Sequence, residues 1–199
     1  MKLNDEGKKL FGYAMERLAA ADISREKWSF GGGTSLMLRY NHRESKDIDI
    51  FFRDPQLLSF VSPRINDAGE DKIKDYSEHT QFTRIVFSEG EIDFIVAPQL
   101  TQNFPELLDV EGFLVMVDSP VEVVAKKVHF RASEFKPRDI FDLAVVYTHM
   151  KTEMLGSAAI FFPHLDVLAD KIEALVKAEL LELYLDELNV ISPEGQKIR

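Results

Sequence analysis

The hydrophobic positions of the chain change their spacing twice, which predicts a helix, then strands, then helices again. Within Asn4–Ala21 apolar residues recur three and four positions apart, the spacing of one face of an amphipathic helix. Short apolar or alternating runs come next, as in half-buried strands. We expect strands at Trp28–Phe30, Asp47–Phe52, Gln81–Phe87, Glu91–Val96 and Gly112–Val117, and a helix opened by a hydroxyl at Thr34–Tyr40.

Two of these strands are separated by a short polar segment. Ser88, Glu89 and Gly90 are typical of a turn, so Gln81–Phe87 and Glu91–Val96 are expected to form a hairpin.

Helical spacing returns after Pro120. It covers Val121–Ala132, Arg138–His149 and Phe162–Leu188, the last expected as one long acidic helix. Strands followed by helices predict an α+β fold, a small mixed or antiparallel sheet with flanking helices and then a helical C-terminal lobe. We place the sheet lobe at 1–118 and the helical lobe at 119–199, and leave open whether they share one core.

Composition narrows the function classes. The 199 residues include no cysteine, which excludes a disulfide framework and a thiolate zinc site. No stretch approaches the roughly 20 apolar residues that span a bilayer, and Met1–Ala20 lacks the features of a signal peptide. We therefore expect a cytoplasmic protein that does not enter a membrane. Its net charge of −10 argues against a protein that coats nucleic acid.

Charge is unevenly distributed along the chain. The segment Lys126–Arg138 contains one acid, Glu134, and five cations, Lys126, Lys127, Arg131, Lys136 and Arg138. By contrast, acids outnumber cations between Asp166 and Glu187. The first segment is therefore the candidate for an anion-binding surface.

A run of glycines supplies the first candidate chemistry. Gly31 to Gly33 come between an expected strand and an expected helix. Glycines let backbone N–H groups approach an anion closely, and the helix N-terminus favours a phosphate. A tight turn with no ligand is the alternative interpretation.

Carboxylates supply the second candidate chemistry. Asp47 and Asp49 are two apart on an expected strand, so both side chains lie on one face, and Glu91 with Asp93 repeats this pattern. Several carboxylates on one face repel one another unless a cation offsets them, and Mg²⁺ prefers oxygen ligands. The alternative is an acidic sheet face that only contacts water.

Together these segments resemble a known family. Gly32-Gly33-Thr34-Ser35-Leu36, followed by Arg43-x-Ser45-x-Asp47-Ile48-Asp49-Ile50, is similar to the first motif of the AbiEii/AbiGii-type nucleotidyltransferases, a branch of the DNA polymerase beta-like superfamily that includes bacterial toxins. Ile92-Asp93-Phe94 fits the context of the third carboxylate, with Glu91 as a substitute. Lys127 and Arg138-Asp139-Ile140-Phe141-Asp142-Leu143 match the later motifs.

The resemblance implies a polymerase beta-like fold and metal-dependent transfer of NMP from an NTP. In it, Asp47, Asp49 and Asp93 would hold two Mg²⁺ ions. Asp139 and Lys127 would be further catalytic residues. The nucleotide contacts it implies are Gly32, Gly33, Thr34, Ser35, Arg43 and Arg138, of which Arg43 could instead brace its loop.

Several side chains also have a structural interpretation. Lys127 either offsets triphosphate charge or pairs with Asp139 or Asp142 between helices, and for Arg131 we favour such a clamp. Lys126 is expected to face solvent. The five histidines are expected to be ordinary core or surface residues, because none has metal-ligand spacing.

Three functions are compatible with the sequence. The first is a toxin of a toxin–antitoxin or phage-defence system that transfers NMP to RNA, with tRNA foremost and a cognate antitoxin as partner. The second is the same chemistry on a small molecule or a protein. The third is a non-catalytic nucleotide-binding scaffold. Apolar residues that widen the stripe of the last helix suggest self-association through it.

Overall fold

The computed structural model describes residues 1–198, in two compact units. The first unit contains Met1–Leu38, Ser45–Pro98 and Pro105–Asp118. The second contains Arg39–Glu44, Gln99–Phe104 and Ser119–Arg199. Two short segments before residue 119, Arg39–Glu44 and Gln99–Phe104, thus group with the helices. The division at residue 118 expected from the sequence places both segments in the sheet lobe instead.

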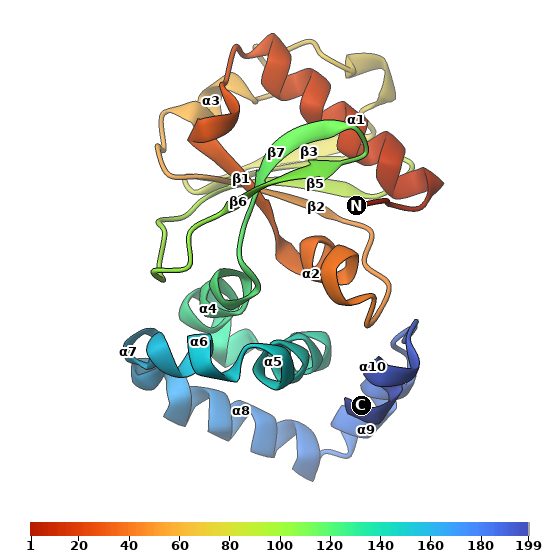
Figure 1. Ribbon diagram of the computed structural model, residues 1–199. Coiled ribbons are helices and arrows are strands. Elements are labelled where there is room, and N and C mark those ends of the chain that lie inside the picture. Colours follow the sequence, from red (N-terminus) through yellow and green to blue (C-terminus); the bar gives the residue numbers. More distant parts are fainter. Residues whose placement is uncertain (199) are drawn as a thin grey trace. The chain divides into compact units, whose positions relative to one another are not determined.

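All strands of the described residues belong to the first unit, where they form one mixed sheet in the order β3-β4-β5-β2-β1-β7-β6 (Figure 1). This agrees with the predicted restriction of strands to the first 117 residues. The strands are β1 (Trp28–Gly31), β2 (Ile48–Phe52), β3 (Asp75–Glu78), β4 (Phe82–Val86), β5 (Glu91–Val96), β6 (Glu106–Val110) and β7 (Phe113–Val117).

The predicted hairpin is confirmed, because β4 and β5 pair in antiparallel fashion across the turn. Two strands were not predicted, β3 and β6, and both lie at the edges of the sheet. The sequence of β3 is Asp-Tyr-Ser-Glu, which lacks the alternation of a half-buried strand. Such edge strands owe their conformation to the pairing partner more than to their own pattern.

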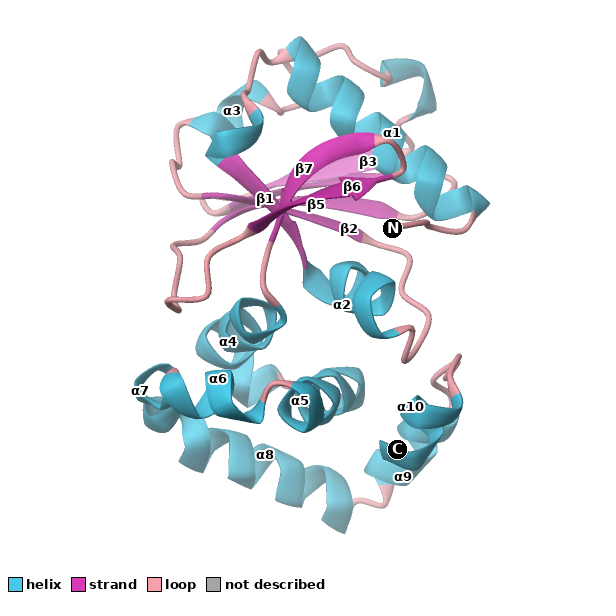
Figure 2. Cartoon of the chain, viewed as in Figure 1, coloured by secondary structure: helices cyan, strands magenta, loops and turns pink. Residues whose placement is uncertain are grey.

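Two helices of the first unit, α1 (Asp5–Ala20) and α3 (Leu57–Phe60), cover one face of its sheet. A third helix, α2 (Gly32–Tyr40), lies on the other side of the sheet, and its last residues pass into the second unit. Figure 2 shows α1 and α3 over the same face. Asn4 caps α1 by accepting a hydrogen bond from the Gly7 N–H at 2.8 Å, as such residues do at helix starts.

The core lies beneath α1. Leu10 and Phe11 of the helix are fully buried with Phe30 of β1 and Ile50 of β2. The rings of Phe11 and Phe30 meet edge to face, with centroids 5.2 Å apart, an arrangement that adds to the burial of apolar area. Because β2 buries Ile48, Ile50 and Phe52 on this side, its intervening residues lie on the opposite face.

The second unit is helical. Its helices are α4 (Pro120–Arg131), α5 (Pro137–His149), α6 (Lys151–Gly156), α7 (Ala158–Phe161), α8 (Leu165–Lys177), α9 (Leu180–Asp186) and α10 (Pro193–Ile198). The first two confirm the predicted helices to within a residue or two. No helix among residues 1–198 has the length and hydropathy needed to cross a membrane.

The single long helix predicted at Phe162–Leu188 is wrong. The chain breaks after α8 at Glu179, whose φ of 55° is left-handed. The N–H groups of Ala178 and Glu179 close the helix on Ala174 and Val176, a helix end that normally carries glycine. Without glycine or proline there, the sequence offers no sign of the break. Val176 is 55% exposed, and self-association through this region stays a prediction.

The break at Glu179 gives a test of the fold. A non-glycine residue in this conformation costs about 1 kcal/mol or more, so Glu179→Gly is expected to raise the free energy of unfolding by about 0.5–1 kcal/mol in urea titrations. The matched control is Glu182→Gly inside α9, where glycine should lower it by about 1 kcal/mol. Equal losses for both variants would contradict the left-handed turn.

Candidate functional site

Two of the predicted carboxylates lie side by side. Strands β2 and β5 are parallel neighbours, and their register places Asp49 directly beside Asp93. Both residues alternate with fully buried isoleucine or phenylalanine, so their side chains share the face turned away from the α1 core. Asp47 comes immediately before β2 and is half-buried. Hence one face of the sheet carries the predicted acids.

The backbone at the start of α2 closes against Asp49. Gly32 has a φ of 68°, and a Cβ there would lie 1.7 Å from Asp49 Oδ2. A Cβ on Gly31 would meet Asp118 Oδ2 at 2.9 Å. At Gly32, only glycine accommodates both the positive φ and the close approach of Asp49. The helix begins two residues earlier than predicted, so that Gly32 and Gly33 form its first turn.

The hydroxyls that follow are used within the protein. Thr34 is fully buried, and its hydroxyl donates to the carbonyl of Asp47 and contacts Ser45 Oγ at 3.0 Å. The Ser35 hydroxyl donates to the Gly32 carbonyl at 2.9 Å. Thr34 therefore ties α2 to the residue that opens the acidic strand, and both hydroxyls stabilise the loop geometry.

Sequence reasoning missed one charged residue of this face, Arg84 on β4. It lies opposite Asp93 in the hairpin register, and its Nε and Nη2 donate to the two Asp93 carboxylate oxygens, each at 2.8 Å. Among the side chains that the structure describes, no three of histidine, aspartate or glutamate gather as a metal cage. The hairpin register, counted outward from Ser88 to Gly90, was the signal that could have found Arg84.

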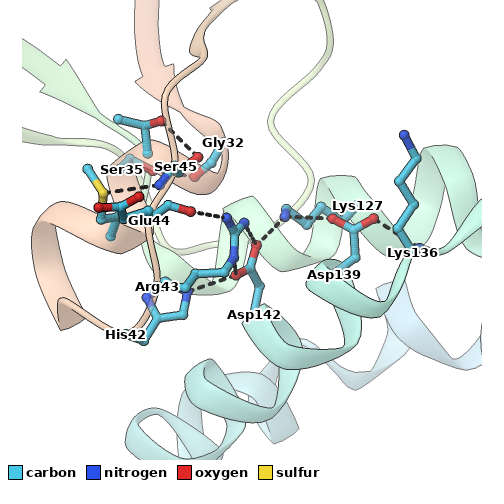
Figure 3. A network of polar contacts seen from close by, with 12 residues as sticks. Gly32, Ser35, His42, Arg43, Glu44, Ser45, Lys127, Lys136, Asp139 and Asp142 are labelled. Carbon is cyan, nitrogen blue, oxygen red and sulfur yellow. Dashed lines mark hydrogen bonds and ion pairs between the residues drawn. The ribbon is translucent and has the colours of Figure 1, made fainter. Parts of the chain in front are cut away.

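A second cluster of charges lies within the helical unit and centres on Asp142 of α5 (Figure 3). Asp142 is fully buried and accepts hydrogen bonds from Arg43 Nε at 2.7 Å, from Arg43 Nη2 at 2.8 Å and from Lys127 Nζ. His42 Nε2 lies 2.7 Å from the same carboxylate. Arg43 thus braces its own segment against α5, one of the two roles expected for it.

Asp139, one turn before Asp142, joins the same cluster. It accepts from Lys127 Nζ at 2.8 Å and from Arg131 Nη2 at 2.7 Å. It also accepts at 3.2 Å from the backbone N–H of Lys136, at the start of α5. Lys127 and Arg131 therefore form the interhelical clamp that was one interpretation of each. That Lys127 also offsets triphosphate charge stays a prediction.

Both aspartates of the cluster are held ionised. Burial by itself raises the pKa of Asp142, but Lys127, His42 and Arg43 outweigh it and bring that pKa well below the ordinary value. Burial likewise raises the pKa of Asp139, and the charges of Lys127 and Arg131 again turn the balance, so that its pKa is lowered. The cluster is a network of paired charges at neutral pH.

The expectation that Lys126 faces solvent is wrong. Its side chain is buried, and Nζ lies 3.5 Å from Glu122 Oε1, one turn earlier on α4. Three of the five cations between Lys126 and Arg138 are thus paired with acids of their own unit, which removes much of the anion-binding surface inferred from composition. Lys136 and Arg138 are exposed.

Comparison with known proteins fits this geometry. The profile of the family described as nucleotidyl transferase AbiEii toxin, type IV toxin–antitoxin system, matches residues 13–161, well over half of the chain. The chain belongs to the AbiEii family. The matched range includes the carboxylate face, the glycine turn and the Asp142 cluster. A comparison with curated protein sequences finds no match.

A solved aminoglycoside nucleotidyltransferase structure shares the fold of this AbiEii-family chain. ANT(2")-Ia in complex with adenylyl-2"-tobramycin is 16% identical with a TM-score of 0.51, over 75% of this chain and 95% of that one. MenT4, a nucleotidyltransferase toxin from Mycobacterium tuberculosis, is 21% identical with a TM-score of 0.46, over 73% of this chain and 61% of that one. The chain thus spans less than two thirds of MenT4.

The close approach at Gly32 generates a prediction. Gly32→Ala places a Cβ on Asp49 in a backbone conformation that alanine resists, so we expect a loss of about 2 kcal/mol or more in unfolding free energy. Gly12→Ala is the matched control. Gly12 lies inside α1 with open space around it, so alanine should stabilise the helix by about 1 kcal/mol. A neutral Gly32→Ala would contradict the contact.

The Asp142 cluster generates another prediction, on the effect of removing the Lys127 charge. Lys127→Met leaves two buried carboxylates with one cation fewer and should lower the unfolding free energy at pH 7 by about 3 kcal/mol, the lower end for breaking a buried pair, because Arg43 and Arg131 remain. Lys177→Met is the control, since the side chain of Lys177 is 77% exposed and its ion pair should contribute less than about 1 kcal/mol.

The pH dependence of this difference follows from the lowered pKa values. A carboxyl whose folded pKa lies below its unfolded pKa, about 3.9 for aspartate, stabilises the fold fully above the unfolded value and loses that contribution as pH falls toward the folded one. The gap in melting temperature between wild type and Lys127→Met should therefore be largest near pH 7 and shrink below about pH 4. A gap that widens in acid would contradict the network.

Proposed function

We propose that this protein is a Mg²⁺-dependent nucleotidyltransferase that transfers NMP from an NTP to a hydroxyl of RNA, with tRNA the first acceptor to test. In this proposal it is the toxin of a bacterial toxin–antitoxin pair, acts in the cytoplasm and has a cognate antitoxin as its protein partner. The observation that carries the proposal is the pairing of Asp49 with Asp93 beside the glycine turn, in a chain of the AbiEii family.

The residues on this sheet face fit a hard divalent cation. Asp47, Asp49 and Asp93 offer carboxylate oxygens, the ligands that Mg²⁺ prefers. Asp49 and Asp93 are neighbours in register, and like charges held so close favour a bound cation. When bound, Mg²⁺ would neutralise the triphosphate and lower the pKa of the attacking hydroxyl.

The chain itself would contribute position and charge. Gly32 and Gly33 would let the first-turn N–H groups of α2 approach the phosphates, since these groups have no partner inside a helix. Thr34 would hold this turn against Asp47 through its hydroxyl. Fixing the triphosphate between the helix start and the acidic strand orients the reacting phosphorus, which accounts for much of the rate enhancement in phosphoryl transfer.

An RNA acceptor is supported by two features. The family is described as a nucleotidyl transferase toxin, and RNA offers a hydroxyl acceptor inside the cell in which such a toxin would act. The start of α5 exposes Lys136 and Arg138, which suit a phosphate backbone better than a cationic antibiotic. Arg138 as a nucleotide contact stays a prediction.

The test is incubation of the purified protein with each α-³²P-labelled NTP, Mg²⁺ and total cellular RNA. Label should appear in a tRNA-sized band. Asp49→Asn should lower the rate at least about a thousandfold, roughly 4 kcal/mol of transition-state stabilisation, without lowering the melting temperature, because it removes one of two neighbouring like charges. Asp71→Asn, at an exposed position of the same unit, should retain full activity.

Other outcomes separate the alternatives. Label in a small-molecule or protein fraction would assign the same chemistry to another acceptor. Absence of label from every fraction, with NTP bound by calorimetry, would contradict transfer and indicate a nucleotide-binding scaffold.

A further inference from the structure

The ion pair between Arg84 and Asp93 has a geometry that concerns the cation site directly. The guanidinium donates to both carboxylate oxygens of Asp93, each at 2.8 Å, so both oxygens already accept a hydrogen bond. The third guanidinium nitrogen, Nη1, lies 3.2 Å from Glu91 Oε2. Arg84 therefore contacts two carboxylates of β5, and one of them is a proposed metal ligand.

The electrostatic environment favours this arrangement in the protein alone. The hydrogen bonds that Arg84 donates to Asp93 are the main cause that raises the pKa of Arg84 above its ordinary value, and the charges of Asp93, Glu91 and Asp47 add to it. Arg84 is thus the counter-ion of the acidic face. It offsets the repulsion that Asp93 and Asp49 would otherwise exert on each other.

The same pair is accessible enough to be exchanged. The side chain of Arg84 is 43% exposed, whereas that of Asp93 is 14% exposed. A guanidinium in contact with water can leave its partner without becoming a buried unpaired charge, so a divalent ion arriving with a triphosphate can replace it. Glu91 lies two positions before Asp93 on the same face of β5 and retains the displaced charge of Arg84.

We propose that Arg84 competes with the cation for Asp93. Its guanidinium binds the Asp93 carboxylate until the metal and nucleotide displace it toward Glu91. The site is then assembled only on loading, and Arg84 sets how strongly it binds a cation without nucleotide. This inference rests on the proposed function, because it takes Asp47, Asp49 and Asp93 as the ligands. Arg84 is a positioning residue that acts through Asp93.

The test measures binding of Mn²⁺ alone to the full chain by electron paramagnetic resonance. Arg84→Met should bind Mn²⁺ at least about tenfold more tightly than wild type, since the ion no longer competes with a charge-assisted fork. Arg84→Lys keeps the charge but loses the two-pronged contact, so its affinity for Mn²⁺ should fall between those of wild type and Arg84→Met. Arg64→Met is the control for a lost arginine, because Arg64 pairs with Glu78 at 2.8 Å and is 70% exposed.

Glu91→Gln provides a second variant that does not depend on the folding of Arg84→Met. Without Glu91 the guanidinium has only Asp93 as a partner, so Mn²⁺ should bind more weakly. The same substitution should have no effect in the Arg84→Met background if Glu91 acts only through Arg84. An equal loss of Mn²⁺ affinity in both backgrounds would make Glu91 a direct ligand and contradict its proposed role as the partner of the displaced Arg84.

Failure of the inference differs from failure of the proposed function. If Arg84→Met binds Mn²⁺ no more tightly than wild type, while Asp49→Asn abolishes binding, Arg84 is only a cross-strand ion pair and the metal site stands. If no variant binds Mn²⁺, even with ATP present, the metal site falls and the inference falls with it.

Discussion

The juxtaposition of like charges on one sheet face is the constraint on which the first unit depends. Parallel pairing of β2 with β5 places Asp49 beside Asp93, and two carboxylates so close are unfavourable unless positive charge is near. The structure meets this need with the guanidinium of Arg84 on one side. The apolar alternation that buries Ile48 and Ile50 keeps the acids on the face away from the core.

The backbone at the glycine turn is shaped by the same acids. Asp49 lies so close to Gly32 that a side chain there has no room, and Gly31 stands in a similar relation to Asp118. The hydroxyl of Thr34 then fixes α2 to the carbonyl of Asp47. Turn, helix start and acidic strand are therefore packed and hydrogen-bonded to one another. In the helical unit, Asp142 has a comparable organising role for Arg43 and Lys127.

Local patterns predicted much of this fold. The polar turn at Ser88 to Gly90 and the alternation beside it were enough to predict the β4–β5 hairpin. The neighbourhood of Asp49 and Asp93 could only be supposed from the family resemblance, because parallel pairing joins segments that are distant in sequence. Glu179 carries no sequence signal for its left-handed conformation. The burial of Lys126 depends on Glu122, one turn earlier on α4, which supplies a buried partner for its ammonium group.

The central claim is that the acidic face of the first unit holds a divalent cation and the phosphates of an NTP. A crystal structure of the protein with Mn²⁺ and a non-hydrolysable NTP analogue tests it most directly, through the anomalous signal of manganese. The account predicts a manganese peak coordinated by Asp47 and Asp49, with the triphosphate at the start of α2. Nucleotide bound elsewhere, with no manganese at these carboxylates, would contradict it.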